Sequence, residues 1–315
     1  LSVAVRDRCE LRIGADGQGS AGLRGRGRRS TAGGEQQCSG GDNPDFAEGT
    51  HGPEASNGPA YLGRIAVLRK IAAGQGIVDA WNTEAGLLAL VGRKMTRFLV
   101  TGAAGFIGSH FVRELLAGHY ELEASGVTVL DKLTYAGNLE NLASVAGDPR
   151  YQFVQGDICD AQLLDALLPG HDVVVNFAAE THVDRSIHGP QDFIVTNVVG
   201  AQTLFDACLR HGVPRTVHIG TDEVYGSIDV GSWNEDEPLR PNSPYSAAKA
   251  SAELLVRAYH VTYGLNISST RCSNNYGPYQ FPEKVIPLFV TNLIDGEQVP
   301  LYGDGLNVRD WLHVD

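Results

Sequence analysis

Two short segments hold the side chains that could do chemistry. Residues 221–226 read Thr-Asp-Glu-Val-Tyr-Gly and contain two adjacent carboxylates, while residues 245–249 read Tyr-Ser-Ala-Ala-Lys. Carboxyl groups can act as general acid and general base, and a phenol beside an ammonium can take the proton of an alcohol that is being oxidised. Together the two segments predict acid–base chemistry coupled to hydride transfer.

The Tyr-x-x-x-Lys pair requires a helix. Tyr245 and Lys249 are four residues apart in a helix predicted over 244–263, so their side chains lie on one face. The ordinary pKa of a phenol is about 10, and we expect the ammonium, together with an oxidised nicotinamide, to lower the pKa of Tyr245. Such a pair by itself is more often a solvated helix face. Its place after a strand predicted over 216–221 favours a catalytic role.

A glycine-rich loop precedes both segments. Residues 101–108 read Thr-Gly-Ala-Ala-Gly-Phe-Ile-Gly and stand between a predicted strand and a predicted helix. Gly102, Gly105 and Gly108 would let the backbone turn tightly and approach a pyrophosphate, whose charge the helix N-terminus stabilises. The spacing is G-x-x-G-x-x-G rather than G-x-G-x-x-G. The alternative is that these glycines only permit close packing of helix and strand.

An acidic residue after the second strand indicates the coenzyme. Asp131 lies 23 residues beyond Gly108, where a carboxylate can accept hydrogen bonds from an adenosine ribose, and this favours NAD over NADP. Lys132 beside it could instead meet a 2′-phosphate. Asp157 and Ile158, after the third strand, could bracket the adenine, although an Asp at a strand end is more often a helix cap.

The segments that must position these residues alternate between strand and helix from Met95 onward. Apolar strands are predicted over residues 98–101, 127–131, 151–155, 172–177, 216–221 and 266–270, and the clearest helices over 105–117, 190–211 and 244–263. This alternation is typical of an α/β fold with a doubly wound parallel sheet of the Rossmann type. We assign residues 95–272 to an NAD-binding domain that carries the catalytic residues, and 273–315 to the start of a substrate-binding subdomain.

Both ends of the chain differ from this pattern. We interpret residues 1–94 as an extension outside the fold, because residues 1–60 are rich in Gly, Arg, Ser, Gln and Asn with little periodic hydrophobicity. The extension is a disordered arm, a pro-segment or upstream sequence read in frame before Met95, and we favour the last. The chain stops at Asp315 within a predicted loop–strand segment, so we expect a C-terminal truncation and an incomplete substrate-binding subdomain.

Composition argues against several classes of protein. Residues 95–315 carry 13 Lys and Arg against 27 Asp and Glu, which disfavours nucleic acid as a partner. The five cysteines are widely spaced without a C-x-x-C, so neither a disulfide framework nor a metal site is indicated, and a reducing cytoplasm is the expected location. No apolar run approaches the ~18 residues of a membrane-spanning helix, so we expect no membrane association.

The motifs together resemble those of the extended short-chain dehydrogenase/reductase superfamily, on the evidence of TGAAGFIGSH at 101–110 and YSAAK at 245–249. Further stretches resemble segments of the dTDP-glucose 4,6-dehydratases within that superfamily: TDEVYG, DKLTYAGNLENL, FAAETHVDRSI, RCSNNYGPYQFPEK and GDGLNVRDWLHV. The resemblance covers residues 95–315.

The resemblance implies a reaction in which a hexose is oxidised at C4, loses water across C5 and C6, and takes hydride back at C6. Glu223 would remove the C5 proton, Asp222 would protonate the leaving hydroxyl, and Thr221 would hydrogen-bond the sugar near O4. We expect burial beside a second carboxylate to raise the pKa of Asp222, so that it can donate a proton at neutral pH. The alternative is that Asp222 and Glu223 only cap the next turn.

The resemblance also implies binding residues, position by position. Those expected to line NAD are Gly102, Gly105, Phe106, Ile107, Gly108, Asp131, Lys132, Leu133, Thr134, Asp157, Ile158, Ala178, Ala179, Glu180, Thr181, His182, Thr196, Tyr245, Lys249 and Asn275. Those expected to meet the nucleotide sugar are His182, Thr221, Asn274, Lys284, Val285, Pro300, Leu301, Tyr302 and Arg309. Lys284 and Arg309 suit a diphosphate, although each can also be interpreted as a surface cation.

The leading hypothesis is an NAD-dependent hydro-lyase that converts dTDP-glucose to dTDP-4-keto-6-deoxyglucose. The enzymatic alternative is a UDP-sugar 4,6-dehydratase or a nucleotide-sugar epimerase, although epimerases of this superfamily typically carry a small polar residue in place of the carboxylate pair. The non-enzymatic alternative is an NAD-binding regulator. Gly220, where relatives commonly have Ser, is expected to have a small effect. The helices over 190–211 and 244–263 could pair in a homodimer of the full-length protein.

Overall fold

The computed structural model describes residues 96–315, and the predictions made for residues 1–94 lie outside the described residues. All the described residues belong to one compact unit. Within them, no helix combines the length and the apolar character that crossing a membrane requires.

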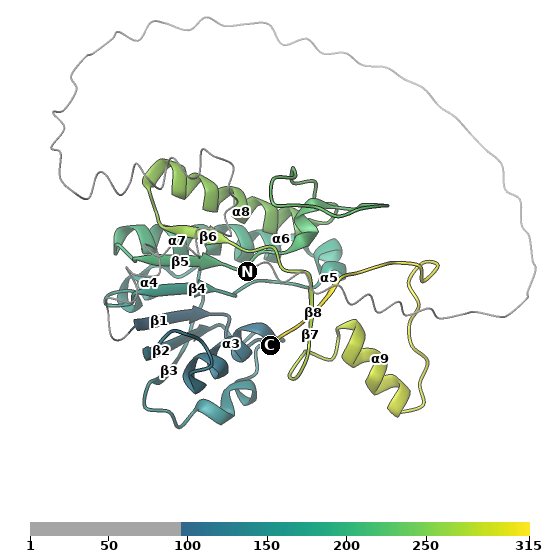
Figure 1. Ribbon diagram of the computed structural model, residues 1–315, viewed down its shortest axis with the longest axis horizontal. Helices are drawn as coiled ribbons and strands as arrows, with labels where there is room; N and C mark the ends of the chain where they lie inside the picture. Colours follow the sequence, from purple (N-terminus) through teal and green to yellow (C-terminus); the bar gives the residue numbers. More distant parts are fainter. Residues whose placement is uncertain (1–95) are drawn as a thin grey trace, which may run out of the picture. The chain divides into compact units, whose positions relative to one another are not determined.

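Six parallel strands form the central sheet, in the order β3-β2-β1-β4-β5-β6 (Figure 1). The chain moves outward from β1 in one direction and then from β4 in the other, so the strand order reverses between β1 and β4. Open α/β sheets bind their ligands in the crevice at this point, outside the carboxyl ends of the strands. The predicted Rossmann-type sheet is confirmed. Its strands are β1 Thr96–Thr101, β2 Ala124–Asp131, β3 Tyr151–Gln155, β4 Val173–Asn176, β5 Arg215–His218 and β6 Ile267–Ser269.

Side chains alternate along the strands between two buried layers. Leu99 packs with Phe205 in one layer, whereas Phe98 and Val100 pack with Leu115 in the other. Because helices cover both faces of the sheet, the strands read as nearly continuous apolar runs. The first layer is covered by α4 Ala161–Leu167, α7 Ala201–Arg210 and α8 Pro244–Tyr263, and the second by α3 Phe106–Ala117 and the 3-10 helix η2 Leu139–Val145.

The helix predicted over 190–211 is not a regular α-helix. It consists of α6 Pro190–Ile194, the π-helical segment η3 Val195–Gly200, and α7. Short π-helical segments inside α-helices are often found at functional sites, because the extra residue in the turn redirects side chains. The strand predicted over 216–221 is also shorter than expected: β5 ends at His218, and Thr221 forms only an isolated parallel bridge with Cys272.

Gly220 lies where two strand ends come very close. A Cβ atom built at this position would collide with the carbonyl oxygen of Thr270 and lie 3.1 Å from the Ser269 Oγ. The Gly220 N–H also donates to the Thr270 Oγ1 at 3.3 Å. A serine here requires the ends of β5 and β6 to separate, so the geometry contradicts the small effect expected from the sequence.

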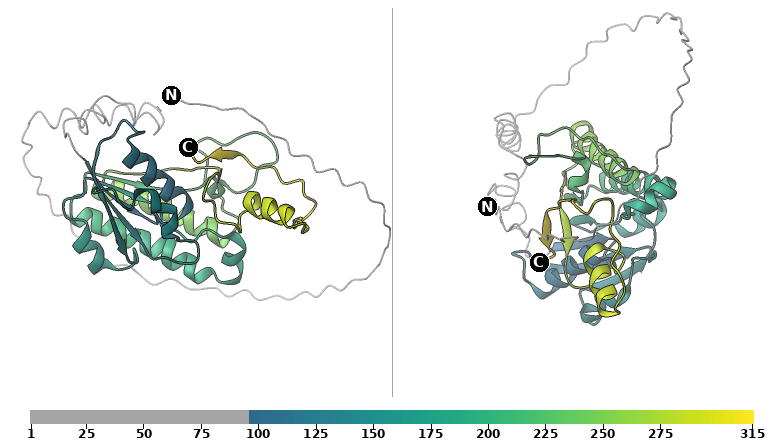
Figure 2. Two further views of the ribbon diagram at one scale, coloured as in Figure 1. Left: turned by 90° about the horizontal axis from the view of Figure 1, so that it is seen from below. Right: turned by 90° about the vertical axis from the view of Figure 1, so that its right-hand side faces the viewer.

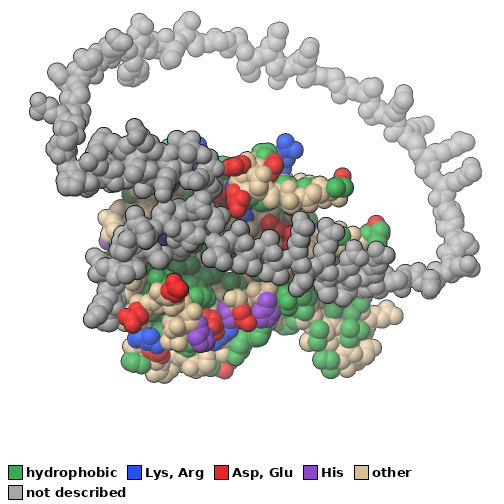
Figure 3. All heavy atoms as spheres, in the orientation of Figure 1, with side chains coloured by type: hydrophobic (Ala, Val, Ile, Leu, Met, Phe, Trp, Pro, Cys, Tyr) green, Lys and Arg blue, Asp and Glu red, His purple; other side chains and the backbone are tan. Residues whose placement is uncertain are grey.

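The C-terminal part of the chain lies beyond the carboxyl ends of the strands, as does α5 Val183–His188 (Figures 1 and 2). It contains the two-stranded parallel sheet of β7 Asn274–Tyr276 and β8 Trp311–His313, with α9 Val285–Ile294 between them in sequence. No residue of α9 is buried. Its exposed apolar side chains, seen at the lower right of Figure 3, are Val285, Ile286, Val290, Leu293 and Ile294. The domain boundary after residue 272 stays a prediction.

Candidate active site

The five residues predicted to be catalytic come together beyond the carboxyl end of β5. Two elements position them: the 3-10 turn η4 Asp222–Tyr225, and the first turns of α8. They are Thr221, Asp222, Glu223, Tyr245 and Lys249.

Local sequence explains where α8 begins and ends. Ser243 and Ser246 form a reciprocal capping box, and Pro244 occupies the first helical turn, where its missing N–H costs nothing. Gly264 ends the helix with a φ of +71°, in the left-handed region that favours glycine. This start places Tyr245 and Lys249 in the first two turns, directed toward the end of β5.

The turn η4 is held from both sides. The Asp222 N–H donates to the Cys272 carbonyl at 3.0 Å, which joins the turn to the segment after β6. The Thr221 hydroxyl caps the turn by accepting from the Glu223 N–H at 3.3 Å. Because Thr221 supplies the cap, the two carboxylates are not needed for it, and the interpretation of Asp222 and Glu223 as mere caps loses its support.

Lys249 is hydrogen-bonded to the segment just after β5 and is not exposed to solvent. Its side chain is buried, and its Nζ donates to the Ile219 carbonyl at 2.5 Å. Burial lowers the pKa of Lys249 to about 8, because the ammonium is moved out of water. The helix face that carries the Tyr-x-x-x-Lys pair is therefore not a solvated one.

The protein's own groups raise the pKa of Tyr245. Burial is the main cause and the negative charge of Glu223 adds to it, while the Thr221 hydroxyl acts in the opposite direction. Tyr245 also packs edge to face against Phe193, with ring centroids 6.3 Å apart. The protein's own groups thus favour the neutral phenol, because the ring is enclosed and its nearest charges are carboxylates. The lowering expected from the ammonium together with an oxidised nicotinamide stays a prediction.

Asp222 and Glu223 are half-buried, and both have raised pKa values. Burial is the main cause for each. For Asp222, the Thr221 hydroxyl opposes the rise and the charge of Asp310 adds to it. For Glu223, the charge of Asp222 adds most after burial, while Arg309 and Lys284 oppose the rise. The direction agrees with the prediction for Asp222, and Asp310 is a further carboxylate that acts on it.

The glycine loop supports both interpretations made from the sequence. A Cβ atom at Gly102, which has a φ of +67°, would collide with the backbone of Ala178, and one at Gly108 would lie 2.8 Å from the Ala103 Cα. Close packing is therefore a sufficient reason for these two glycines. Gly105 is the N-cap of α3 and provides no side-chain cap, so the first amides of this 12-residue helix have no side-chain acceptor. Such an N-terminus suits an anion.

Asp131 joins the glycine loop to the end of β2. Its Oδ2 accepts from the Ala104 N–H at 2.9 Å, and its Oδ1 accepts from the Leu133 N–H at 2.8 Å. An ionised carboxylate has about four acceptor sites, so further hydrogen bonds remain possible. The residue is in position to serve both the loop and a ribose.

Lys132 forms an ion pair with a neighbouring strand end. Its Nζ lies 2.7 Å from the Asp157 Oδ2, and the pairing lowers the pKa of Asp157 despite that residue's burial. The N-cap of α4 is Asp160, so Asp157 is not the cap of that helix. The positive charge of Lys132 is offset by an acid rather than left for a 2′-phosphate.

Asn197, on the π-helical segment η3, holds the loop after β4. It is 2% exposed; its Oδ1 accepts from the Glu180 N–H at 2.8 Å and its Nδ2 donates to the Glu180 carbonyl at 2.9 Å. The sequence analysis included Thr196 but missed Asn197. The available signal was an amide side chain beside Thr196 in the largely apolar run of residues 194–199.

The remaining residues expected to line NAD lie in the segments that follow β2, β3 and β4, at the start of α3, on η3 and on β7. Ile158 differs from the others because it is 3% exposed and belongs to the hydrophobic core. The others are Phe106 and Ile107 at the start of α3, Leu133 and Thr134 after β2, Ala178, Ala179, Glu180, Thr181 and His182 after β4, Thr196 on η3 and Asn275 on β7.

Lys284 and Arg309 approach the acidic pair from the C-terminal part. The Lys284 Nζ donates to the Thr181 carbonyl at 3.4 Å, and burial lowers the pKa of Lys284. It is therefore not a simple surface cation. Arg309 is exposed, so its two interpretations stay open. The other residues expected to meet the sugar nucleotide are His182 at the N-cap of α5, Asn274 on β7, Val285 at the start of α9, and the exposed Pro300, Leu301 and Tyr302.

A cluster of which the sequence analysis named only His182 joins the segments after β2 and β4 to the C-terminal part. Glu283 accepts from the Tyr135 hydroxyl at 3.1 Å, pairs with Arg185 at 3.5 Å and lies 3.7 Å from the His182 Nε2. The Arg185 guanidinium lies over the Tyr135 ring at 3.7 Å. All four residues stand within stretches that carry the family resemblance, which was the available signal.

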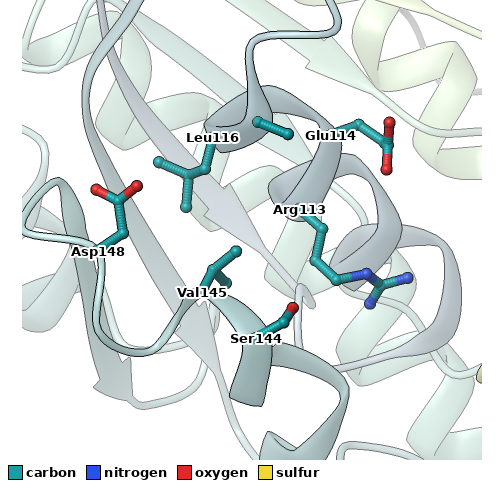
Figure 4. A pocket seen from close by; sticks show the side chains of 7 residues that line it. Arg113, Glu114, Leu116, Ser144, Val145 and Asp148 are labelled. Atoms are coloured by element: carbon teal, nitrogen blue, oxygen red, sulfur yellow. The ribbon is translucent and has the colours of Figure 1, made fainter.

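A hollow of about 430 Å³ lies away from these residues, between the end of α3 and η2 (Figure 4). Because α3 ends there and the chain enters β3 there, it lies at the amino ends of the strands, opposite the catalytic edge. Its lining includes none of the predicted site residues: Arg113, Glu114, Leu116, Ala117, Ser144, Val145 and Asp148. Among residues 96–315, no three His, Cys, Asp or Glu side chains are grouped to hold a metal ion.

Known proteins resemble this chain over the described residues. Residues 99–315 match the family model described as GDP-mannose 4,6 dehydratase. A dTDP-glucose 4,6-dehydratase from Actinoplanes sp. is 60% identical over 220 residues, which cover 69% of this chain and 69% of that protein. One from Streptomyces antibioticus is 64% identical over 219 residues, which cover 69% of this chain and 64% of that protein.

A solved structure shares the fold as well. The crystal structure of a dTDP-glucose 4,6-dehydratase from Streptomyces venezuelae with NAD and TYD bound matches with a TM-score of 0.69 and 64% identity, over 70% of this chain and 68% of that one. The chain thus spans 64% to 69% of the length of these relatives. With this identity and with the acidic pair set beside Tyr245 and Lys249, the chain belongs to the dTDP-glucose 4,6-dehydratase family.

Proposed function

We propose that the protein is an NAD-dependent hydro-lyase that converts dTDP-glucose to dTDP-4-keto-6-deoxyglucose. The observation that carries this proposal is the placement of Asp222 and Glu223, both with raised pKa values, on one turn beside Tyr245 and Lys249. Oxidation of an alcohol needs only Tyr245 and Lys249. The two carboxyl groups add the acid and the base that loss of water requires.

The residues divide the work by their surroundings. Tyr245, as the phenolate, takes the proton of the C4 hydroxyl and becomes the neutral phenol that its enclosed surroundings favour. The ammonium of Lys249, on the same helix face, favours the phenolate before this transfer. Oxidation at C4 makes the C5 proton acidic; Glu223 removes it, and Asp222 protonates the departing C6 hydroxyl. Burial raises the pKa of both carboxyl groups and so favours the protonated form that Asp222 needs. Arg309 and Lys284 oppose the rise at Glu223, which acts as the base.

NAD fits the residues at the carboxyl edge of the sheet. When bound, the coenzyme would supply the acceptor for the hydride from C4 and the hydride for C6, and Glu223 would return its proton to C5, which saturates the C5–C6 bond. The open N-terminus of α3 suits its pyrophosphate, and Asp131 has acceptor sites left for a ribose. The ion pair between Lys132 and Asp157 supports NAD rather than NADP.

The test is the mass of the product. Incubation of the full-length protein with NAD and dTDP-glucose is expected to give loss of one water with no net NADH. Glu223→Gln should still allow NAD to be reduced by the substrate but slow the loss of water by about 100-fold. Glu237→Gln, a change at an exposed glutamate in the loop after η4, is the matched control and should leave both steps unchanged.

Each alternative has its own outcome. Unchanged mass with altered stereochemistry would indicate an epimerase, and preferred dehydration of a UDP-sugar would move the assignment to the other nucleotide. Binding of NAD with no reduction by any nucleotide sugar would support the regulator. Elimination at the original rate in Glu223→Gln would contradict the base assigned here.

We infer that the protein forms a homodimer through the outer faces of the helices over 190–211 and 244–263. The support is a set of exposed apolar side chains on these neighbouring elements. They are Ile194, Val195 and Val199 on α6 and η3, and Leu254 and Val261 on α8, with exposed fractions between 42% and 65%. Sedimentation equilibrium measures the assembly.

We also propose a cytoplasmic location. In the described part of the chain, Cys159, Cys208 and Cys272 are unpaired thiols, which suits a reducing compartment. Cell fractionation with an antibody to the protein tests this assignment, and recovery from the medium or from membranes would contradict it.

A further inference from the structure

The helix that carries Tyr245 and Lys249 has a third functional position on the same face. Glu253 follows Lys249 by four residues, so the three side chains line up along α8. The Glu253 side chain is 13% exposed, and its Oε2 has no hydrogen-bond partner. A largely enclosed acid beyond the catalytic pair requires an explanation.

Arg271 is the partner of this acid. Its Nε donates to the Glu253 Oε1 at 2.7 Å, and its Nη2 reaches the same oxygen. Its Nη1 donates to the Tyr225 hydroxyl at 2.6 Å and to the Glu235 carbonyl at 2.8 Å. One guanidinium, 19% exposed, thus connects α8, the last residue of η4 and the loop that follows.

Arg271 contacts the end of η4 opposite to Asp222 and Glu223, and we call η4 the acid–base turn because it carries these two residues. Tyr225 stacks on Trp233 at 5.4 Å and is buried, while Asp222 and Glu223 occupy the first two positions of the same turn. The residue after Arg271 is Cys272, whose carbonyl accepts from the Asp222 N–H. Arg271 therefore acts on both ends of η4.

Stability alone is a weak reason for such an arrangement. A buried ion pair costs desolvation that its attraction barely offsets, and an unpaired buried oxygen on Glu253 adds to that cost. A pair of this kind is better explained by the geometry that it fixes.

We propose that Arg271 and Glu253 are positioning residues, which fix the turn carrying Asp222 and Glu223 against the helix carrying Tyr245 and Lys249. The proposal rests on the proposed function for its catalytic meaning, because only a dehydratase needs both pairs in register. Lysine cannot replace the arginine, since one ammonium cannot contact Glu253, Tyr225 and Glu235 through a planar fork.

Hydrogen–deuterium exchange of the full chain tests the positioning without substrate. In Arg271→Lys, the amides of Asp222, Gly226 and Arg240 should exchange about 10- to 100-fold faster, because each is bonded within or onto the turn. The amides of β1 and β2 should not change. Arg257→Lys, at an exposed arginine of α8, is the matched control.

A second variant covers the case in which Arg271→Lys does not fold. Tyr225→Phe keeps the ring on Trp233 and removes only the hydroxyl that Arg271 binds, so the same amides should exchange about 3- to 10-fold faster. Unchanged exchange in η4, or equally faster exchange in the central sheet, would overturn the proposal, since a merely structural pair would loosen the whole fold.

Turnover supplies the second measurement. In Arg271→Lys, loss of water from dTDP-glucose should slow by about 100-fold, while reduction of NAD by the substrate stays within about threefold. Equal slowing of both steps would contradict the assignment to the acid–base turn. If the unmodified full-length protein does not convert dTDP-glucose, the proposed function fails, and the exchange result still decides whether Arg271 and Glu253 hold the turn.

Discussion

At the scale of single residues, the active centre works against the stability of the fold. Burial disfavours the ionised forms of Asp222 and Glu223, and it disfavours the ammonium of Lys249. Perturbed groups of both signs gathered in one site are typical of catalytic centres. Replacing such a group with a neutral one should raise the free energy of unfolding and lower the catalytic rate.

Glu223→Gln is expected to raise the free energy of unfolding at pH 7, on the order of 1 kcal/mol. The pKa of Glu223 is higher in the folded than in the unfolded chain, where it is 4.5. The stability that this group contributes is therefore complete below pH 4.5 and is lost as the pH rises through the folded pKa. Urea unfolding should show the gain at pH 7 and none near pH 4. Glu237→Gln is the control, and no gain at pH 7 would contradict the raised pKa.

The chemistry of single residues could be predicted only in part. Asp222, Glu223, Tyr245 and Lys249 were found from residue types and spacing, because their roles need those groups in that order. The upward shift of the Tyr245 pKa could not be predicted from the sequence, since it depends on which charges surround the side chain in the folded protein. Asp310 acts on Asp222 from 88 residues away in sequence, and no local pattern indicates such a neighbour.

At the scale of elements, the ends that carry capping residues were predicted best. The helix predicted over 244–263 is found as Pro244–Tyr263, because Ser243, Pro244 and Gly264 mark both ends. The π-helical turn of η3 was not predicted, since its residues suit an α-helix equally well. Only the hydrogen bonds of Asn197 with the loop after β4 reveal why the wider turn is useful.

Asn197→Asp should break this connection without changing the size of the side chain. One carboxylate oxygen can still accept from the Glu180 N–H, but the other faces the Glu180 carbonyl where an N–H donated before. We expect a loss of about 2 to 4 kcal/mol in urea unfolding and weaker binding in an NAD titration. Asn234→Asp is the control, because exposed Asn234 only accepts, from the Asp236 N–H. Unchanged NAD affinity would contradict the role given to Asn197.

At the scale of the whole molecule, exposed apolar side chains are the main feature that the fold itself does not explain. Burial of the strands on both sides accounts for the core, and hydrophobic periodicity was sufficient to predict it. The outer face of α8 does not contribute to that core: Leu254 is 59% exposed and Val261 is 65% exposed. A second copy of the chain is the partner proposed above.

Leu254→Glu should convert the proposed homodimer to monomers, because two carboxylates would face each other across a two-fold interface. Sedimentation equilibrium should show the mass halved at the concentration where the unmodified chain is dimeric. Val230→Glu is the matched control, since Val230 is 90% exposed in the loop after η4 and away from both helices. A mass that is the same for Leu254→Glu and the unmodified chain would contradict this interface.

The lack of buried residues in α9 has a consequence for cooperativity. A helix that shares no core with the six-stranded sheet is not obliged to unfold with it, and its amides should open at a much lower free energy than those of β1 and β2. Although the described residues form one compact unit, we expect α9 to unfold separately from the sheet. A ligand or partner that covers the apolar side of α9 should raise the opening free energy of the α9 amides only. The free energy of unfolding of the central sheet should not change.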